Sequence, residues 1–361
     1  MLDLLKGTDD RLLFLFWAIS ISLVVISVVV CLILGLRRIY RNIKKNKRLT
    51  KQTKFESALN TALTADLKDI NFKGRDFENL PVFNEVLLRY FRMLNGERAE
   101  ALRMITEVQN FEPQLCASTK VGTVGRRMEA MQVLSYLKTQ GSLLAIHDGL
   151  SSSKKYIRLT AARCLTRRST DMFIDDIIYS INTAFPDDPQ LLADILFRFG
   201  PSIAPKLESC VQSDSNASIK TAGLEALVLM MPAETTLRLD ELLESSDERV
   251  RAAAVSLSAV TAHHSDIDIL STALTDTSTK VKIRAAKIAH KARRTDTISP
   301  LFKLAHDPLL WVRYWSIKAI WNTGRQGKKL VDTMGQGDSS SSRMAREVAL
   351  ECKTINIQAT S

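Results

Sequence analysis

The sequence has few residues that interrupt helices, with only 14 glycines and 9 prolines among 361 residues. Apart from an apolar stretch near the N-terminus, it also has few runs in which β-branched residues alternate with period two. Half-buried strands need that alternation, and compact sheet proteins need frequent turns rich in glycine and proline. The scarcity of both disfavours a sheet protein and predicts an all-α chain.

Cysteine is sparse as well. The five cysteines are odd in number and far apart, and two of them, Cys31 and Cys164, fall within apolar helical patterns. A small secreted domain held together by disulfides would have an even number of cysteines at close spacing. The sequence therefore predicts reduced thiols in a domain that faces the cytoplasm.

No pattern of catalytic residues or metal ligands stands out. His263 and His264, together with Asp266 and Asp268, could be drawn as a metal site. Asp266 is better explained as an acidic residue in the first turn of a helix, and zinc-type Cys/His spacing is absent. We therefore expect no enzyme activity, no cofactor, no metal and no small-molecule substrate.

The positive net charge of +11 is unevenly distributed. Nine basic residues and no acidic one lie between Arg37 and Lys54, so the chain from Phe55 onward carries little net charge. Within that part, residues 280–329 hold 13 basic residues against only Asp296 and Asp307. A nearly neutral domain disfavours nucleic acid as the main partner, while a local basic region indicates a surface that prefers acidic partners.

A long apolar segment occupies residues 12–36, which are 25 residues without an ionisable side chain other than Cys31. At about 1.5 Å per helical residue the segment exceeds the roughly 30 Å hydrocarbon core of a bilayer. It is too long for a cleaved signal peptide, and the residues before it are acidic. The basic residues 37–54 follow directly, which places the C-terminal part in the cytoplasm and residues 1–11 outside, in the plasma or inner membrane. The same residues would lie against anionic lipid.

An internal repeat of constant period organises the rest of the chain. Pairs of an aliphatic and a basic residue recur at Ile219-Lys220, Val250-Arg251, Val281-Lys282 and Val312-Arg313. Small residues stand four places after each aliphatic one, and an Asp or Ser stands five places before it. This spacing predicts an amphipathic helix with a turn in front of it, and short apolar segments upstream predict a first helix in each unit. The repeat period is typical of a stacked helical solenoid.

The repeat resembles the HEAT-repeat family, whose units carry an Asp in the turn and an aliphatic-Arg pair early in the second helix. The resemblance covers residues 121–352 and implies about seven or eight helix-turn-helix units. It also implies a ladder of hydrogen bonds between units, in which Asp214 would pair with Lys220, Asp276 with Lys282, and Asp307 with Arg313. Residues 55–120 are expected to form a linker helix and an N-terminal helical cap that includes a hairpin closed at Asn95-Gly96, and residues 353–361 a C-terminal tail.

The exposed face of the second helices supplies the candidate binding residues. The candidates occupy four positions per unit: one before the aliphatic residue and three, six and ten after it. These positions lie within about 60° of one another, on the side of the helix away from the aliphatic and small residues that pack. Basic and aromatic residues gather there in the last units, and we expect the following ones to contact a protein partner: Lys280, Arg284, Lys287, Lys291, Trp311, Trp315 and Lys318. Two alternatives stay open, a solvated basic face and tryptophans that merely cover the end of the core.

The leading hypothesis is a non-enzymatic, membrane-tethered scaffold or adaptor that presents a cytoplasmic solenoid surface to a protein within a membrane-associated complex. Nucleic-acid binding by residues 280–329 is the alternative that the interleaved basic and aromatic residues suggest. An accessory subunit of a membrane-embedded enzyme, such as a polysaccharide synthase, is compatible with the same features. An enzymatic role rests on fold analogy alone.

Overall fold

The structure is a computed structural model that describes residues 2–64, 83–168, 171–214, 216–261 and 266–360. Every regular element in these ranges is a helix, and no strand occurs among them. The chain divides into two compact units, Met1–Leu137 and Lys138–Ser361, each with its own helices. The predicted all-α class is confirmed.

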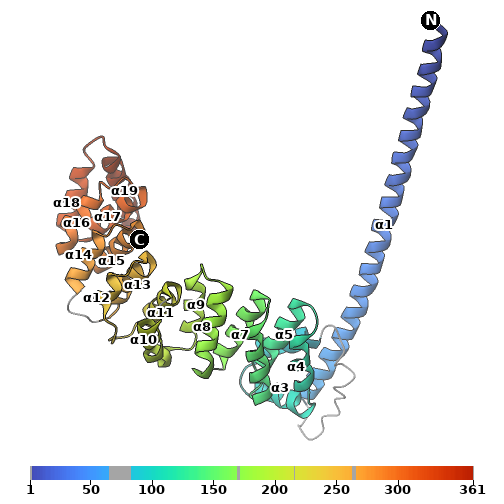
Figure 1. The fold of residues 1–361 in the computed structure, drawn as a ribbon, viewed down its shortest axis with the longest axis horizontal. Helices are drawn as coiled ribbons and strands as arrows, with labels where there is room; N and C mark the ends of the chain where they lie inside the picture. The colour runs from blue at the N-terminus through green and yellow to red at the C-terminus, as the bar shows by residue number, and fades with distance from the viewer. Residues whose placement is uncertain (1, 65–82, 169–170, 215, 262–265, 361) are drawn as a thin grey trace. The chain divides into compact units, whose positions relative to one another are not determined.

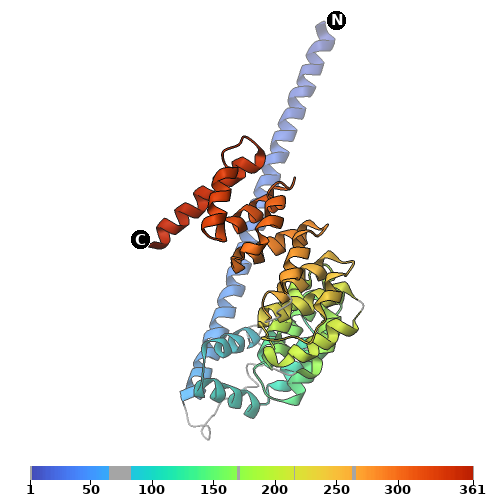
Figure 2. The same ribbon diagram turned by 90° about the vertical axis from the view of Figure 1, so that its left-hand side faces the viewer.

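The first unit begins with α1, a single helix over Leu2–Thr64 that runs unbroken in both views (Figures 1 and 2). The sequence analysis separated a span, a basic segment and a linker helix, whereas the structure joins them into one rod. Phe55 and Leu59 near its end are fully buried, and the Phe55 ring lies 5.4 Å from that of Phe83. The apolar side chains that follow one another every fourth residue there bury the end of α1 in the first unit.

A helical hairpin receives the end of α1. It consists of α2 (Phe83–Met93) and α3 (Glu97–Val108), and Gly96 between them has a φ of +59°. The predicted hairpin is therefore confirmed at Asn95-Gly96, where glycine permits the left-handed backbone. Tyr90 donates a hydrogen bond to the Asn60 side chain at 2.9 Å, which adds a polar contact between α2 and α1. The helices α4 (Glu112–Lys120) and α5 (Val124–Leu134) complete this unit as its one helix pair of the repeating type.

The second unit contains seven further helix pairs, four of them preceded or joined by a short 3₁₀ turn. These pairs are α6 (Gln140–His147) and η2 (Asp148–Ser151) with α7 (Lys155–Arg167), η3 (Asp171–Phe173) and α8 (Ile174–Ala184) with α9 (Pro189–Phe197), η4 (Pro201–Ile203) and α10 (Ala204–Ser213) with α11 (Ala217–Met230), α12 (Leu239–Leu243) with α13 (Glu248–Ser258), α14 (Asp266–Leu274) with α15 (Thr279–Ala292), η5 (Thr295–Thr297) and α16 (Ile298–Leu304) with α17 (Leu310–Asn322), and α18 (Arg325–Met334) with α19 (Ser340–Thr360). With α4 and α5, the described residues hold eight pairs, within the seven or eight that the resemblance implies. The architecture is a HEAT-like α-solenoid.

The second helix of each pair packs on the second helix of the next, from α7 through to α19. The aliphatic residue of the repeat lies at the centre of this packing, and Val250, Val281 and Val312 are almost entirely buried. The small residue four places later allows close approach: a Cβ added at Gly223 in α11 would lie 2.7 Å from the Val211 side chain of α10. The predicted amphipathic pattern is confirmed, because both the aliphatic residue and the small residue four places later face the core.

The ladder between units exists, but its rungs join different residues from those implied by the resemblance. Arg251 donates two hydrogen bonds to the carboxylate of Asp276 in the next unit, at 2.8 and 2.9 Å, and Lys282 donates one to Asp307 at 3.2 Å. The basic residue thus reaches 25 positions forward, to the following turn, rather than back to the Asp of its own turn. For Asp276 and Asp307 the expected pairing was wrong by one unit, and the pairing of Asp214 with Lys220 stays a prediction.

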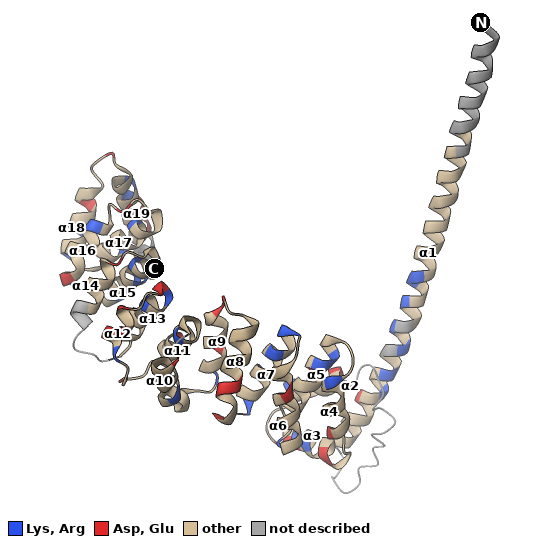
Figure 3. Ribbon diagram, in the orientation of Figure 1, with Lys and Arg blue, Asp and Glu red and all other residues tan. Residues whose placement is uncertain are grey.

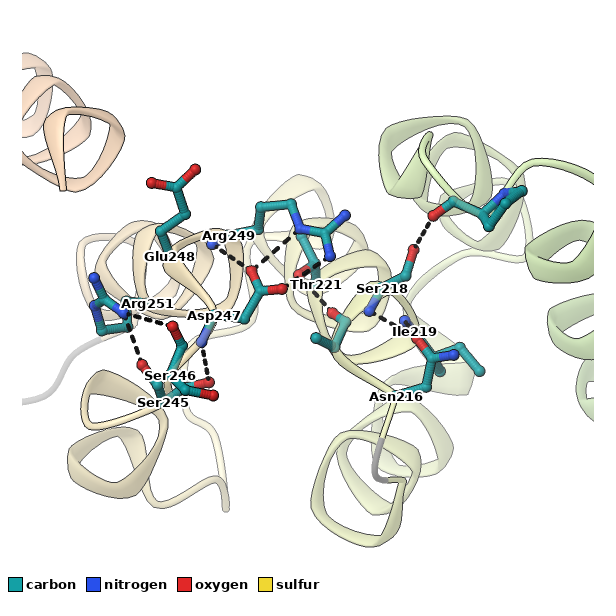
Figure 4. Close-up of polar contacts among 12 residues, drawn as sticks. Asn216, Ser218, Ile219, Thr221, Ser245, Ser246, Asp247, Glu248, Arg249 and Arg251 are labelled. Carbon is teal, nitrogen blue, oxygen red and sulfur yellow. Dashed lines mark hydrogen bonds and ion pairs between the residues drawn. The ribbon is translucent and has the colours of Figure 1, made fainter.

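The physical reason lies in the turns themselves. The side chains of Asp276 and Asp307 each accept the backbone N–H two residues later, which holds the carboxylate at the start of the second helix. Toward the turn of their own unit, the arginines of the repeat donate to backbone carbonyls. Arg251 donates to Ser245 and Ser246 in this way (Figure 4), and Arg313 donates to the carbonyls of Asp307 and Pro308.

Two helices differ in extent from what the sequence pattern indicates. The apolar segment upstream of α13 is helical only over Leu239–Leu243, because the buried carboxylate of Glu208 accepts hydrogen bonds from Thr235 and Thr236 and holds them outside the helix. At the other end, α19 runs to Thr360 and is the long terminal helix of Figure 2. It therefore includes residues 353–360, which the sequence analysis assigned to a tail.

Candidate partner-binding groove

Five of the seven candidate residues line one cavity of about 820 Å³ in the second unit, which brings them together as a site. They are Arg284, Lys287 and Lys291 on α15, and Trp315 and Lys318 on α17. Lys280 lines a neighbouring cavity of about 570 Å³, which shares Arg284 and Lys287 with the first. Trp311 lines neither of the two. We call the larger cavity the basic groove.

Part of the lining of the basic groove is apolar, and we call this part its floor. Val228 of α11, Leu270 of α14 and Ile288 of α15 line it, together with Val260 just after α13. Leu270 and Ile288 belong to one unit, whereas Val228 and Val260 come from the two units before it, and the stacking of the units brings all four to one cavity. Clefts that bind ligands or peptides are typically apolar with a few polar groups at their edges.

The charged residues of the lining, which we call its edge, are basic, and none of the described side chains that line the groove is acidic. Three of its cations are paired with carboxylates set just outside. Arg284 pairs with Glu225 at 2.6 Å, Lys318 with Glu351 at 2.6 Å and Arg294 with Asp296 at 2.6 Å. Their charges are largely compensated within the protein.

Lys287 and Lys291 differ from these three. Both are exposed on α15, one helical turn apart, and neither takes part in any ion pair identified among the described residues. The ammonium of Lys287 lies 4.8 Å from the centre of the Trp315 ring. A cation over an aromatic face keeps its charge, so both lysines remain available to an anionic group from outside.

The two candidate tryptophans have different surroundings. Trp315 is half-buried, packs against the core of the last units, and meets the Tyr314 ring edge to face at 5.2 Å. Trp311 is 60% exposed and touches only the edge of the aromatic group, with 5.8 Å between its ring centre and that of Tyr314. Covering the end of the core therefore explains Trp315 in part, but it does not explain Trp311.

Lys318 belongs to a polar cluster with Tyr314 and Glu351. Burial alone would lower the pKa of Lys318, but hydrogen bonds to Glu351 and Tyr314 outweigh it and raise this pKa. The same bond to Lys318 lowers the pKa of Glu351. Lys318 therefore stays charged but is fixed by α19, which makes it part of the wall of the groove rather than a free contact.

His290 is a lining residue that the sequence analysis did not single out as a candidate. Its Nδ1 lies 3.2 Å from the backbone carbonyl of Lys318. Burial lowers the pKa of His290, and the nearby charges of Lys318, Arg293 and Lys291 act in the same direction. The imidazole is therefore neutral at pH 7. Glu225 was missed too, because it lies 59 positions from Arg284 and no local pattern connects them.

The neighbouring cavity has a different charge. Asp187 and Asp188, which precede α9, line it together with Glu225, opposite Arg249 and Lys280. Asp188 also caps α9 by accepting the N–H of Leu191 at 3.1 Å. The lining of the two cavities is therefore basic where α15 and α17 contribute to it, and it holds both acidic and basic residues toward α9. Figure 3 colours the basic and acidic residues of the described chain on the ribbon.

Within the described ranges, no group of three or more His, Cys, Asp or Glu residues is arranged to hold a metal ion. The His263-His264 pair that could be drawn as such a site lies outside the described residues. The pKa values of Cys116, Cys210 and Cys352 are all raised, in each case mainly by burial. Burial of this kind disfavours the thiolate, which is the nucleophilic form.

The sequence matches no protein-family model and none of the curated proteins. Among solved structures, human deoxyhypusine hydroxylase is similar at 15% identity and a TM-score of 0.29, over 69% of this chain and 96% of that one. Importin beta is similar at 14% identity and a TM-score of 0.44, over 81% of this chain and 52% of that one. Kap121p bound to Nup53p is similar at 14% identity and a TM-score of 0.42, over 81% of this chain and 40% of that one.

The chain therefore spans about half of importin beta and two fifths of Kap121p. The helix pairs, their buried aliphatic and small residues and the ladder between units make the chain a HEAT-like solenoid.

Proposed function

We propose that this protein is a non-enzymatic, membrane-tethered scaffold that binds a protein partner through the basic groove, within a membrane-associated complex. The observation that carries the proposal is the continuity of α1. One unbroken helix contains the uncharged residues 12–36 at one end and the buried Phe55 and Leu59 at the other. A bilayer anchor and a folded domain would thus share a single rigid element.

The apolar part of α1 is the only helix in the described residues that is long and apolar enough to cross a membrane. Side chains such as Leu23, Ile26 and Leu34 are exposed along it and have no protein partner. Burying them in hydrocarbon would remove this apolar surface from water. The basic residues 37–54, seen as bands after the apolar stretch in Figure 3, then favour a cytoplasmic solenoid and contact with anionic lipid.

The basic stretch would also act as a spacer. Residues 37–54 are helical throughout, which corresponds to roughly 27 Å at the rise of an α-helix. The end of α1 is fixed in the N-terminal helical cap of the first unit by Phe55, Leu59 and the ion pair between Glu56 and Arg89. We infer that the cap is held off the bilayer surface at a set distance and orientation, as a scaffold within a membrane complex requires.

Two measurements on the full-length protein in its native cells test the proposal. The chain should remain in the membrane fraction after carbonate extraction, and protease added outside intact cells should leave the solenoid uncut. A photo-crosslinking residue in place of Lys291 should yield a protein adduct, whereas the same residue in place of Lys303, exposed on α16, should yield much less. Release into the soluble fraction, or equal adducts at both positions, would refute it.

Nucleic-acid binding remains the second candidate, since the groove combines cations with Trp315. Most of its cations are compensated by carboxylates, which leaves few charges for a polyphosphate. Titration with labelled DNA and RNA at two salt concentrations distinguishes the two, because only phosphate contacts give a steep salt dependence. An accessory role beside a membrane-embedded enzyme would appear as crosslinks from Lys291 to that enzyme.

A further inference from the structure

We infer that the basic groove binds a short acidic segment of its partner, which inserts at least one large apolar side chain between α13, α15 and α17. This inference rests on the proposed function and specifies the chemistry of the partner. It follows from three properties of the groove: two uncompensated charges, an apolar floor and a size that suits a segment rather than a folded surface.

The first property is charge. Lys287 and Lys291 are the two lining cations for which no carboxylate partner is found in the described part of the chain, and none of the described side chains that line the groove is acidic. They lie on the same side of α15, one turn apart, a separation of about 6 Å between Cβ atoms by helical geometry. Two carboxylates in neighbouring or alternate positions of an extended peptide match that spacing. Charge complementarity of this type selects the partner and speeds its association.

The second property is the apolar floor. Carboxylates alone would leave the half-buried Val228 and Ile288 of the lining uncovered. A large aliphatic or aromatic side chain would cover them and reach the half-buried ring of Trp315. Binding energy in such sites comes mainly from apolar anchors in desolvated pockets, while charged groups at the edge add specificity.

The third property is size. A cavity of about 820 Å³ lies within the range that encloses a small ligand or a few side chains of a peptide. It is too small to receive the surface of a folded domain. The neighbouring cavity extends the path toward Asp187 and Asp188, so we expect basic residues in the segment beyond its acidic part. The order of charges would then fix the direction in which the segment lies.

The test selects peptides from a random library displayed on phage, with the full-length protein in nanodiscs as the target. We expect enrichment of peptides that combine two or more acidic residues with a large apolar one. Binding of the best peptide, measured by fluorescence anisotropy, should weaken at least about tenfold in the double variant Lys287→Glu with Lys291→Glu.

A control double variant changes the net charge of the protein by the same amount. Lys303→Glu with Lys329→Glu reverses two exposed lysines on α16 and α18, away from the groove, and should change binding less than about twofold. A third variant, Ala292→Trp, fills the groove at an exposed position without removing a core contact, and it should also weaken binding at least about tenfold.

Enrichment of basic or uncharged peptides, equal loss of binding in the control variant, unchanged binding in Ala292→Trp, or no enrichment at all would overturn the inference. Competition by a DNA or RNA oligonucleotide with a steep salt dependence would overturn it in favour of a nucleic-acid site. If crosslinks from position 291 to a partner persist while acidic peptides fail, the scaffold function stands and only this partner chemistry is refuted.

Discussion

The two sides of the second helices use basic residues in opposite ways. On the side of the turns, Arg251 and Lys282 are largely buried and their charges are paired with Asp276 and Asp307 of the next unit. Around the groove, Lys287 and Lys291 are exposed on the same helix as Lys282 and have no such partner in the ion pairs of the described residues. Residue type alone does not separate the two groups.

The difference shows which charges hold the solenoid together. A buried charge needs a partner, so the turn side must supply one for each basic residue of the repeat. An exposed lysine remains hydrated and needs none. We therefore expect changes on the turn side to alter stability, and changes at Lys287 and Lys291 to alter binding with little effect on stability.

The largest expected effect comes from breaking a rung of the ladder. Asp276→Ala leaves the guanidinium of Arg251 nearly buried without its carboxylate and removes the acceptor for the Ser278 N–H. We expect a loss of about 3 kcal/mol in the local opening free energy of α13 and α15. Hydrogen exchange of their amides measures it, because solenoid units can open separately. Asp332→Ala, which removes an exposed ion pair with Lys353, should change it by less than about 0.5 kcal/mol.

The next largest effect is expected at Trp315, whose loss should cost more stability than the loss of Trp311. Trp315→Ala removes a half-buried ring that packs on the core, and we expect a loss of about 2 kcal/mol in α15 and α17. Trp311→Ala removes a ring that is 60% exposed and should cost less than about 0.5 kcal/mol. Equal losses would mean that both rings serve the core, and Trp311 would no longer be a candidate contact.

Acid should weaken the turn side selectively. A hydrogen bond from Arg251 is the main cause that lowers the pKa of Asp276 in the folded protein. Its stabilising contribution is therefore complete above the ordinary pKa of an aspartate and is lost as the pH falls through the lowered value. Hydrogen exchange of α13 and α15 should accelerate in that acidic range. The Asp276→Asn variant should show a flatter pH dependence, and an unchanged profile would contradict the assignment.

The smallest effect on stability is expected at the groove. Lys287→Glu with Lys291→Glu removes no ion pair found in the described residues, so the opening free energy of α15 should change by less than about 0.5 kcal/mol. Loss of the Lys287 contact with Trp315 is the main cost. A larger loss would show that the two lysines support the fold, and the contrast between the two sides would disappear.

Much of the architecture was predictable because the repeat is a local signal. The spacing of Val250, Val281 and Val312 gives both the helix face that is buried and the length of each unit, and stacking such units leaves few alternatives. The short helix α12 was not predictable in the same way. Its start depends on Glu208, which lies 27 and 28 positions before Thr235 and Thr236 and accepts hydrogen bonds from both.

The sequence by itself determined the helical class, the unit length, the unbroken apolar segment and the basic and aromatic residues of the last units. The tertiary structure decided which charges are compensated. Arg251 meets Asp276 of the next unit, 25 positions on, and Arg284 meets Glu225 two units earlier, 59 positions back, only because the units stack. Local periodicity fixes the side of a helix to which a residue points, whereas the partner it finds there depends on the next helix in the stack.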